Sequence, residues 1–308
     1  MTPKVKTFLE RGLSTVILLA LLGGTVCWNS PIGYALLVCV LCNLTSYEWF
    51  NMLRERGRAA NRKLALAAGL VYPWLMAAGM LLLSEQAEPI FVSGEDGPVA
   101  LFAVFDFSLM ALAMLVLYVL VAFFCELYRM DYKGSDGSTA LSSIGITILS
   151  FVYPVWLFAF ALSTLSTPES IWNLLWLVLV TKMSDIWAYV SGVLLGGKFI
   201  KRRFSPVVSP KKTWEGIIGS FIITSVCGWY MLGLTDFEFA LTPVVFFCVL
   251  MPCIFILSVA GDLAGSLIKR GLAVKDSGSL LPGIGGIFDL IDSPAFTVSF
   301  FVAVMAIL

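Results

Sequence analysis

The chain has 308 residues, of which 59% are hydrophobic and 13% are charged, and its mean hydropathy is +0.93. Soluble globular proteins contain roughly 45–50% apolar and about 25% charged residues, so the composition excludes an ordinary soluble enzyme and indicates a membrane protein. The 20 Lys and Arg residues are cancelled by 20 Asp and Glu residues, which leaves no basic excess for binding nucleic acid.

Nine apolar segments are predicted to span the membrane, because a bilayer core needs about 20 apolar residues per helix. They are residues 13–28, 31–51, 64–84, 99–125, 140–165, 170–197, 214–233, 239–260 and 286–308. The predicted fold class is therefore an all-α integral membrane protein. With the N-terminus in the cytoplasm and the C-terminus outside, every Lys and Arg except Lys182 falls in or beside an inner connection.

This pattern divides the chain into two predicted regions. Residues 1–165 hold spans one to five, and residues 166–308 form a catalytic region with spans six to nine and cytoplasmic loops at 198–213 and 261–285. The first region is mostly featureless, with Glu48 and Asp106 as isolated acids. We therefore place the chemistry in the second region. Because the chain has no histidine, that chemistry must use carboxylates, lysines, arginines and hydroxyls.

Asp185 lies in the middle of the sixth span, three residues after Lys182. An ionisable group inside a membrane span is costly and indicates a functional site. The two opposite charges could simply neutralise each other on one helix face. The glycines that follow, Gly192 and Gly196, and the basic loop after them favour a polar cavity instead.

The segment Ser209-Pro210-Lys211-Lys212-Thr213 directly precedes the seventh span. Thr213 is predicted to be the N-cap of that helix, where exposed N–H groups favour bound phosphate. Lys211 and Lys212 are predicted to contact the phosphate, and Glu215 to orient a lysine or a metal-bound water. The other basic residues of this loop are also compatible with an anchor on anionic lipid.

The third cluster contains three aspartates. Asp262 closes the eighth predicted span, and Asp289 and Asp292 lie three apart, on one face of a helix. With few neutralising bases nearby, these carboxylates would repel one another unless a cation joins them. Hard oxygen donors predict Mg²⁺, and leave a second cation open. Gly283, Gly285 and Gly286 would allow close approach of phosphate, so we predict a cytoplasmic-side site for a Mg²⁺-bound polyphosphate.

These residues resemble the phosphatidate cytidylyltransferases, the CDP-diacylglycerol synthases. That family's signature runs Ser, two residues, Lys-Arg, four residues, Lys-Asp, then Pro-Gly-His-Gly-Gly, two residues, and Asp-Arg-x-Asp. The matching residues here are Ser266, Lys269, Arg270, Lys275, Asp276, Pro282, Gly283, Gly285, Gly286, Asp289 and Asp292. The segments around Asp185 and from Ser209 to Gly216 also look like family motifs. Ile284 stands where the signature has histidine, and Leu290 where it has arginine.

The resemblance implies a reaction of CTP with phosphatidate in the bilayer, giving CDP-diacylglycerol and pyrophosphate, in a membrane of the bacterial inner type. Metal on Asp262, Asp289 and Asp292 would act on the CTP phosphates, and Lys211 and Lys212 would balance charge. The expected substrate-binding residues are Asp185, Ser209, Thr213, Glu215, Ser266, Lys269, Arg270, Lys275, Asp276, Gly283, Gly285 and Gly286. Other expected partners are membrane lipids and a second copy of the chain in a homodimer.

Three alternatives remain open at the level of sequence. The first is a CTP-dependent transferase or kinase that acts on another lipid phosphate or an isoprenoid lipid. The second is a cation transporter that uses the intramembrane acids, although these acids gather at one membrane face instead of forming a ladder across it. The third is a catalytically silent scaffold, suggested by Ile284 and Leu290.

Overall fold

The computed structural model describes residues 23–24, 31–55, 61–86, 98–133, 137–166, 168–233, 242–278, 280 and 285–305. Within these residues, eight helices are long and apolar enough to cross a membrane. This confirms the predicted all-α membrane fold. The eight helices correspond to the second to ninth predicted spans, and the first, at 13–28, falls almost wholly outside the described residues.

The chain forms two compact units. The first unit comprises Met1–Pro168, Asp276–Ile291 and Val302–Leu308, and the second comprises Glu169–Lys275 and Asp292–Phe301. The first division lies close to the predicted boundary at residue 165. The segment that carries Asp289, however, groups with the N-terminal helices, whereas Asp292 groups with the second unit.

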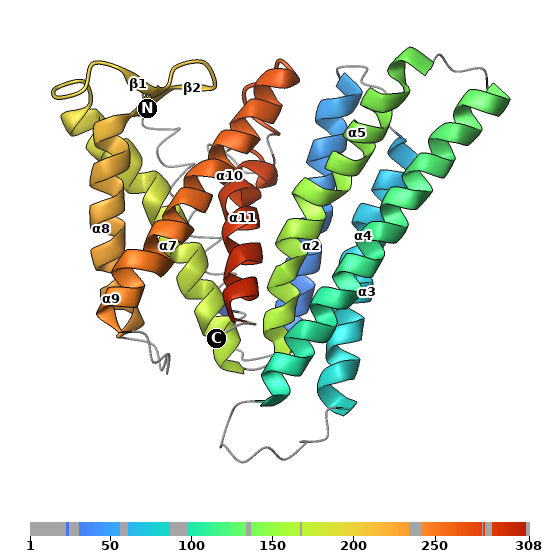
Figure 1. The fold of residues 1–308 in the computed structure, drawn as a ribbon, viewed down its shortest axis with the longest axis horizontal. Helices are drawn as coiled ribbons and strands as arrows, with labels where there is room; N and C mark the ends of the chain where they lie inside the picture. The colour runs from blue at the N-terminus through green and yellow to red at the C-terminus, as the bar shows by residue number, and fades with distance from the viewer. Residues whose placement is uncertain are drawn as a thin grey trace, which may run out of the picture. The chain divides into compact units, whose positions relative to one another are not determined.

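The first unit is built on four spans that lie side by side (Figure 1). Its elements are α2 (Pro31–Glu55), α3 (Arg62–Gln86), α4 (Pro98–Lys133), η1 (Gly137–Thr139), α5 (Ala140–Phe151), η2 (Val152–Trp156), α6 (Leu157–Ala159) and η3 (Phe160–Ser166). The last four elements form one continuous span, with a π-helical turn at η2. Pro154 lies in that turn, and a wider turn accommodates a proline ring that would clash with a regular helix.

The second unit contains three long helices, a hairpin and part of the last helix. Its elements are α7 (Pro168–Leu195), β1 (Arg203–Ser205), β2 (Ser209–Thr213), α8 (Trp214–Leu232), α9 (Pro243–Val245), η4 (Phe246–Leu250), α10 (Met251–Gly271) and α11 (Ile287–Met305), which contributes Asp292–Phe301. A second π-helical turn, η4, leads into α10 just before Pro252. In this span too, a wider turn directly precedes a proline and relieves the clash of its ring with the preceding turn.

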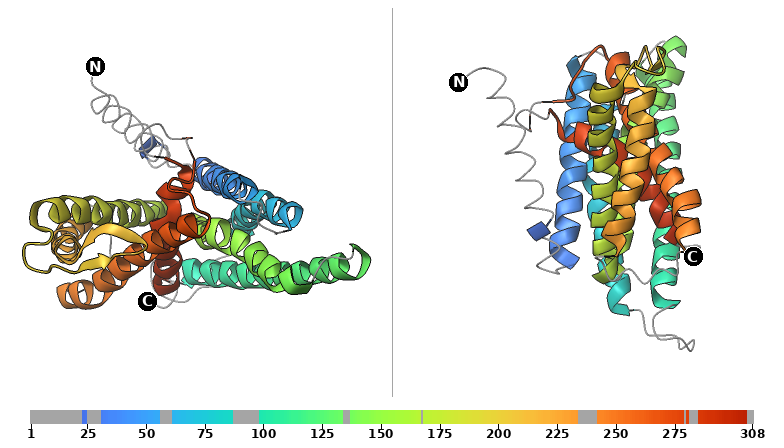
Figure 2. Two further views of the ribbon diagram at one scale, coloured as in Figure 1. Left: turned by 90° about the horizontal axis from the view of Figure 1, so that it is seen from above. Right: turned by 90° about the vertical axis from the view of Figure 1, so that its left-hand side faces the viewer.

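Two features of the second unit differ from the prediction. The segment 198–213, predicted as a loop, contains the antiparallel pair β1 and β2, which lies at the N-terminal end of α8 (Figure 2). The eighth span was predicted to close at Asp262, but α10 continues to Gly271. Hydropathy ends a span at its first charge, whereas this helix continues because Asp262 and Lys269 find ionic partners inside the unit.

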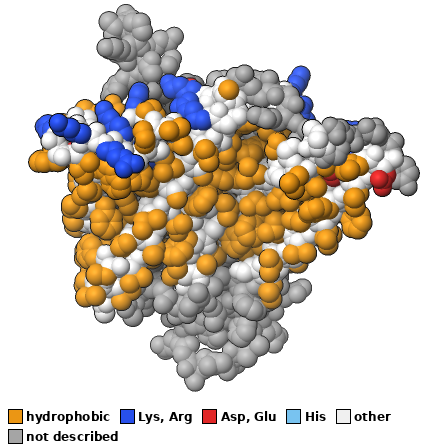
Figure 3. Space-filling view, turned by 45° about the horizontal axis from the view of Figure 1, so that its top comes forward, with side chains coloured by type: hydrophobic (Ala, Val, Ile, Leu, Met, Phe, Trp, Pro, Cys, Tyr) orange, Lys and Arg blue, Asp and Glu red, His pale blue; other side chains and the backbone are white. Residues whose placement is uncertain are grey.

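The surface fits a membrane environment. Hydrophobic side chains cover most of the face in Figure 3, and Lys and Arg side chains gather along one end of it. Large apolar side chains on helix flanks are exposed, among them Leu112, Ile222 and Ile256, each more than half exposed. Such surfaces are expected to contact lipid tails.

Candidate active site

Six charged side chains form a cluster in the second unit, here termed the six-charge cluster. Its members are Lys182 and Asp185 of α7, Lys212 of β2, Asp262 and Lys269 of α10, and Asp292 of α11. Lys182 Nζ lies 3.6 Å from Asp185 Oδ2 and 3.8 Å from Asp292 Oδ1. Lys212 Nζ lies 2.5 Å from Asp262 Oδ2, and Lys269 Nζ lies 4.0 Å from Asp292 Oδ2.

Three lysines thus balance three aspartates. Asp292 is only 3% exposed and Lys269 only 9%, so their charges are held where water cannot solvate them fully. The prediction of aspartates with few neutralising bases nearby is therefore wrong for Asp262 and Asp292. The lysines come from three separate elements, so counting charges along the chain could not find them.

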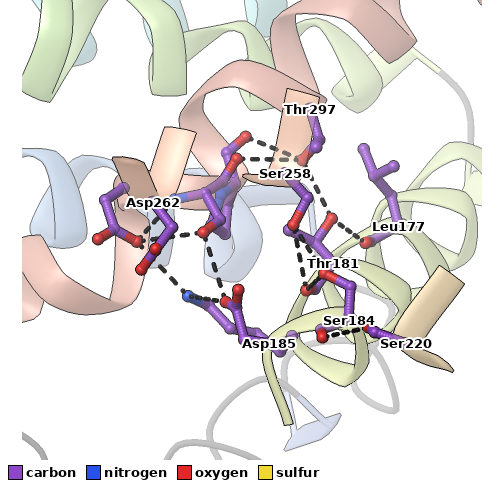
Figure 4. A network of polar contacts seen from close by, with 12 residues as sticks. Leu177, Thr181, Ser184, Asp185, Ser220, Ser258, Asp262 and Thr297 are labelled. Atoms are coloured by element: carbon purple, nitrogen blue, oxygen red, sulfur yellow. Dashed lines mark hydrogen bonds and ion pairs between the residues drawn. The ribbon is translucent and has the colours of Figure 1, made fainter. Parts of the chain in front are cut away.

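Hydroxyl groups beside the cluster join the helices (Figure 4). The Ser184 and Ser258 hydroxyls are 2.8 Å apart and link α7 to α10. The Thr181 and Thr297 hydroxyls, 3.1 Å apart, link α7 to α11, and Ser220 of α8 donates to the Ser184 carbonyl. Small polar residues of this kind hold membrane helices together, and no motif in the sequence marks them.

The start of α8 is built as predicted. Thr213 is the N-cap, and its hydroxyl accepts a hydrogen bond from the Gly216 N–H at 3.1 Å. Because side chains alternate along a strand, Lys211 and Lys212 of β2 point in opposite directions. Lys212 reaches Asp262, whereas Lys211 is exposed. Phosphate binding by both lysines stays a prediction.

Glu215 has a different set of contacts from the one expected. Its Oε1 accepts three backbone hydrogen bonds, from Gly197 at 3.1 Å, Phe199 at 3.1 Å and Ile200 at 2.8 Å. These bonds fix the chain between α7 and the hairpin. Glu215 therefore orients backbone at this position, where the sequence suggested a lysine or a metal-bound water.

The first unit holds the other part of the signature. Asp289 Oδ2 accepts hydrogen bonds from the Ser277 N–H at 3.1 Å, the Ser277 hydroxyl at 2.8 Å and the Gly286 N–H at 3.1 Å. Gly285 has a φ of +120°, which only glycine adopts readily. Glu48 of α2 joins this group through Ser277 and Phe288. In the sequence, Glu48 is recognisable only as an isolated acid.

The remaining candidates are spread along α10 and its exit. Ser266 is half-buried on α10, and Arg270 Nη1 donates to the Val274 carbonyl at 3.4 Å. Lys275 and Asp276 are exposed, and Ser209 is half-buried at the start of β2. Gly283 lies outside the described residues, as do Pro282 and Ile284.

Among the described residues, no three His, Cys, Asp or Glu side chains converge closely enough to hold a metal ion by themselves. The residues still suit a hard cation that arrives with a nucleotide, because Mg²⁺ at such sites commonly takes one or two carboxylates together with substrate phosphates. Metal binding by Asp262, Asp289 and Asp292 remains a prediction.

Comparison with known proteins identifies the family. Proteins named phosphatidate cytidylyltransferase are similar to this chain. The one from Haemophilus influenzae is 39% identical over 118 residues, 38% of this chain and 41% of the relative. The one from Staphylococcus saprophyticus is 32% identical over 189 residues, 61% of this chain and 65% of the relative. The chain thus spans less than two thirds of the length of these two relatives.

A longer match is found with the phosphatidate cytidylyltransferase of Brucella abortus, which is 29% identical over 287 residues, 91% of this chain and 88% of the relative. The sequence model of the Cytidylyltransferase family matches residues 9–308, nearly the whole chain. The chain therefore belongs to the Cytidylyltransferase family.

Proposed function

We propose that the protein is a phosphatidate cytidylyltransferase, which converts CTP and phosphatidate into CDP-diacylglycerol and pyrophosphate. The observation that carries the proposal is the six-charge cluster, in which three lysines and three aspartates meet among membrane helices. The names of the relatives support the choice of substrates.

The proposed reaction needs no general base. An oxygen of the phosphatidate phosphate attacks the α-phosphorus of CTP, the bond from the α-phosphorus to the bridging oxygen breaks, and pyrophosphate leaves. A phosphate monoester has its second pKa near 6, so at neutral pH it is already a nucleophile. The absence of histidine from the sequence is therefore no obstacle to this chemistry.

The lysines of the six-charge cluster balance the charge of the reacting phosphates in this proposal. Lys182, Lys212 and Lys269 would exchange aspartate for phosphate as their partner when CTP enters. Asp185, 3.6 Å from Lys182, orients that lysine within α7. Catalysis would then consist of positioning and charge neutralisation.

Mg²⁺ is part of the proposal. Asp262 and Asp292 would hold it in the second unit, with Asp289, three residues before Asp292 in α11, as the further ligand suggested by the signature. When bound, Mg²⁺ would polarise the α-phosphate and stabilise the leaving pyrophosphate. Each of these two aspartates also contacts a lysine, Lys182 in the case of Asp292 and Lys212 in the case of Asp262.

We place the site on the cytoplasmic side of a bacterial inner membrane. The basic hairpin segment supports this side, because cytoplasmic connections carry the Lys and Arg excess. Phosphatidate would enter laterally between helices, with its acyl chains remaining in the bilayer. A homodimer remains a proposal that rests only on the apolar flanks of the helices.

The proposal is tested with purified protein in mixed micelles with labelled CTP, phosphatidate and Mg²⁺, by following label into lipid. Asp292→Asn should lower transfer about 10²-fold, because a buried carboxylate is lost from the proposed metal and lysine site. The control Asp131→Asn changes an exposed aspartate of α4 and should transfer at the original rate. Chelation should abolish transfer, and added Mg²⁺ should restore it.

Two results would count against this function. Binding of CTP without transfer to phosphatidate would indicate another acceptor, such as an isoprenoid lipid phosphate. Failure to bind CTP at all would exclude a cytidylyltransferase and favour a scaffold or a transporter.

A further inference from the structure

Glu48 of α2 is buried against the N-terminus of α11 in the first unit. Its side chain is 2% exposed. Oε2 accepts hydrogen bonds from the Phe288 N–H at 2.9 Å and from the Ser277 hydroxyl at 3.2 Å. Phe288 is the second residue of α11, and the first four N–H groups of a helix have no partner inside it. Glu48 therefore caps α11 from a position 240 residues away in the chain.

No side chain at the residue before α11 can cap the helix, so Glu48 supplies the cap. Gly286 directly precedes α11, at the position where a side chain would normally cap the helix. A Cβ atom at Gly286 would collide with both the Ser277 hydroxyl and Glu48 Oε2. Asp289 completes the arrangement by accepting the Gly286 N–H, as the third helical residue does in a capping box.

Apolar packing holds the same two helices in register. The Trp49 and Phe288 rings have centroids 5.5 Å apart, and Tyr153 lies 5.5 Å from Phe288. The Trp49 indole donates to the Ser150 hydroxyl at 2.7 Å, which fixes the ring. The residue next to Glu48 in α2 thus packs against the residue whose N–H Glu48 caps.

Capping a helix with a buried carboxylate costs free energy, because the carboxylate loses its contact with water. Glu48 Oε1 has no hydrogen-bond partner among the described residues, and a Cβ atom on Gly278 would come within 2.6 Å of it. The positive end of the α11 dipole offsets part of the cost of burying this charge. The geometry thus ties α2 to both ends of the segment from Ser277 to Phe288.

We propose that Glu48 is a positioning residue for the cytidylyl transfer proposed above. By capping α11 and holding Ser277, it keeps the segment of Ser277, Gly285, Gly286 and Asp289 in one arrangement for the nucleotide polyphosphate. This inference rests on the proposed function for its catalytic consequence. The positioning itself can be measured without any activity.

The test compares two variants of Glu48, one that keeps the length of the side chain and one that keeps its charge. Glu48→Gln keeps the length of the side chain and an oxygen that can accept the Phe288 N–H, whereas Glu48→Asp keeps the charge but is too short to reach it. Glu126→Gln is the matched control, because Glu126 is a buried glutamate of the same unit that contacts Arg129 and Ser143. Hydrogen exchange of each protein is measured in detergent.

Glu48→Asp should increase exchange in peptides covering 276–290 roughly fivefold, the effect of a lost helix cap, and leave other helices unchanged. Glu48→Gln and Glu126→Gln should exchange like the original protein. In the assay, Glu48→Asp should raise the KM for CTP with the KM for phosphatidate unchanged, and lower kcat/KM for CTP about tenfold.

The inference would be overturned if Glu48→Asp matched the original protein while Glu48→Gln did not, since charge and not capping would then matter. Increased exchange throughout the first unit would also overturn it, because Glu48 would then have a general structural role. If the original protein transfers no cytidylyl group but the exchange pattern holds, the positioning is supported and the proposed function is overturned.

Discussion

Lys211 and Lys212 are neighbours in β2 with different surroundings. Lys212 pairs with Asp262 in the six-charge cluster, and Lys211 is exposed. Lys212→Ala is expected to lower cytidylyl transfer about 10²-fold, because it removes a cation from the proposed phosphate site and leaves Asp262 without its partner. Lys211→Ala should cost less than about threefold, as is usual for a solvated charge. Transfer of labelled CTP in micelles measures both, and equal losses would show that both lysines contact phosphate.

Single residues were predictable from sequence where their role is local. Thr213 was identified as an N-cap because a cap is defined by residues within one turn. The pairing of Lys182 with Asp292 was not, because the two residues are brought together only by the packing of α7 against α11. Glu48 was overlooked for the same reason, since Ser277 and Phe288 lie more than two hundred residues later.

At the scale of elements, helix positions were predictable and their ends were not. Hydropathy located the eight described spans because each needs a long apolar run. It ended α10 too early at Asp262, and it missed the π-helical turns at Pro154 and before Pro252. It also missed the hairpin, since β1 and β2 together are short and polar, with no apolar alternation to reveal a strand.

The C-terminus of α10 contains a strained residue that yields a prediction. Ala273 has a φ of +51°, and the Val274 N–H donates to the Lys269 carbonyl at 2.9 Å in a Schellman motif. Glycine adopts this conformation without the clash of a Cβ atom, so Ala273→Gly should raise the free energy of unfolding by roughly 1 kcal/mol. The matched change Ala264→Gly, inside α10, should lower it by a similar amount.

Thermal unfolding in detergent checks the pair of changes at Ala273 and Ala264. Shifts of roughly 2 °C in opposite directions are expected for a chain of this length. A lower Tm for Ala273→Gly would mean that residue 273 does not take the left-handed conformation in the folded protein.

At the scale of the whole molecule, the two compact units divide the signature between them. Asp289 groups with the N-terminal helices and Asp292 with the second unit, although both belong to α11. The predicted regions separated the chain at one point, because hydropathy orders spans along the sequence and carries no information on which spans pack together. The N-terminal helices therefore help to hold the signature residues in place, through contacts such as that of Glu48 with Phe288. The sequence-based prediction had placed all the chemistry in the second region.

The orientation predicted from the charge pattern is testable at the two ends of α8. This helix has 19 residues, a length of about 28 Å that suffices to cross a bilayer core. Val207, in the hairpin turn, is 86% exposed, and Val244, in α9 beyond the other end, is 69% exposed. In a background without native cysteines, Val207→Cys should react with an impermeant maleimide only from the cytoplasmic side, and Val244→Cys only from the outer side. The reverse pattern would invert the predicted topology, and labelling of both from one side would mean that α8 does not cross the membrane.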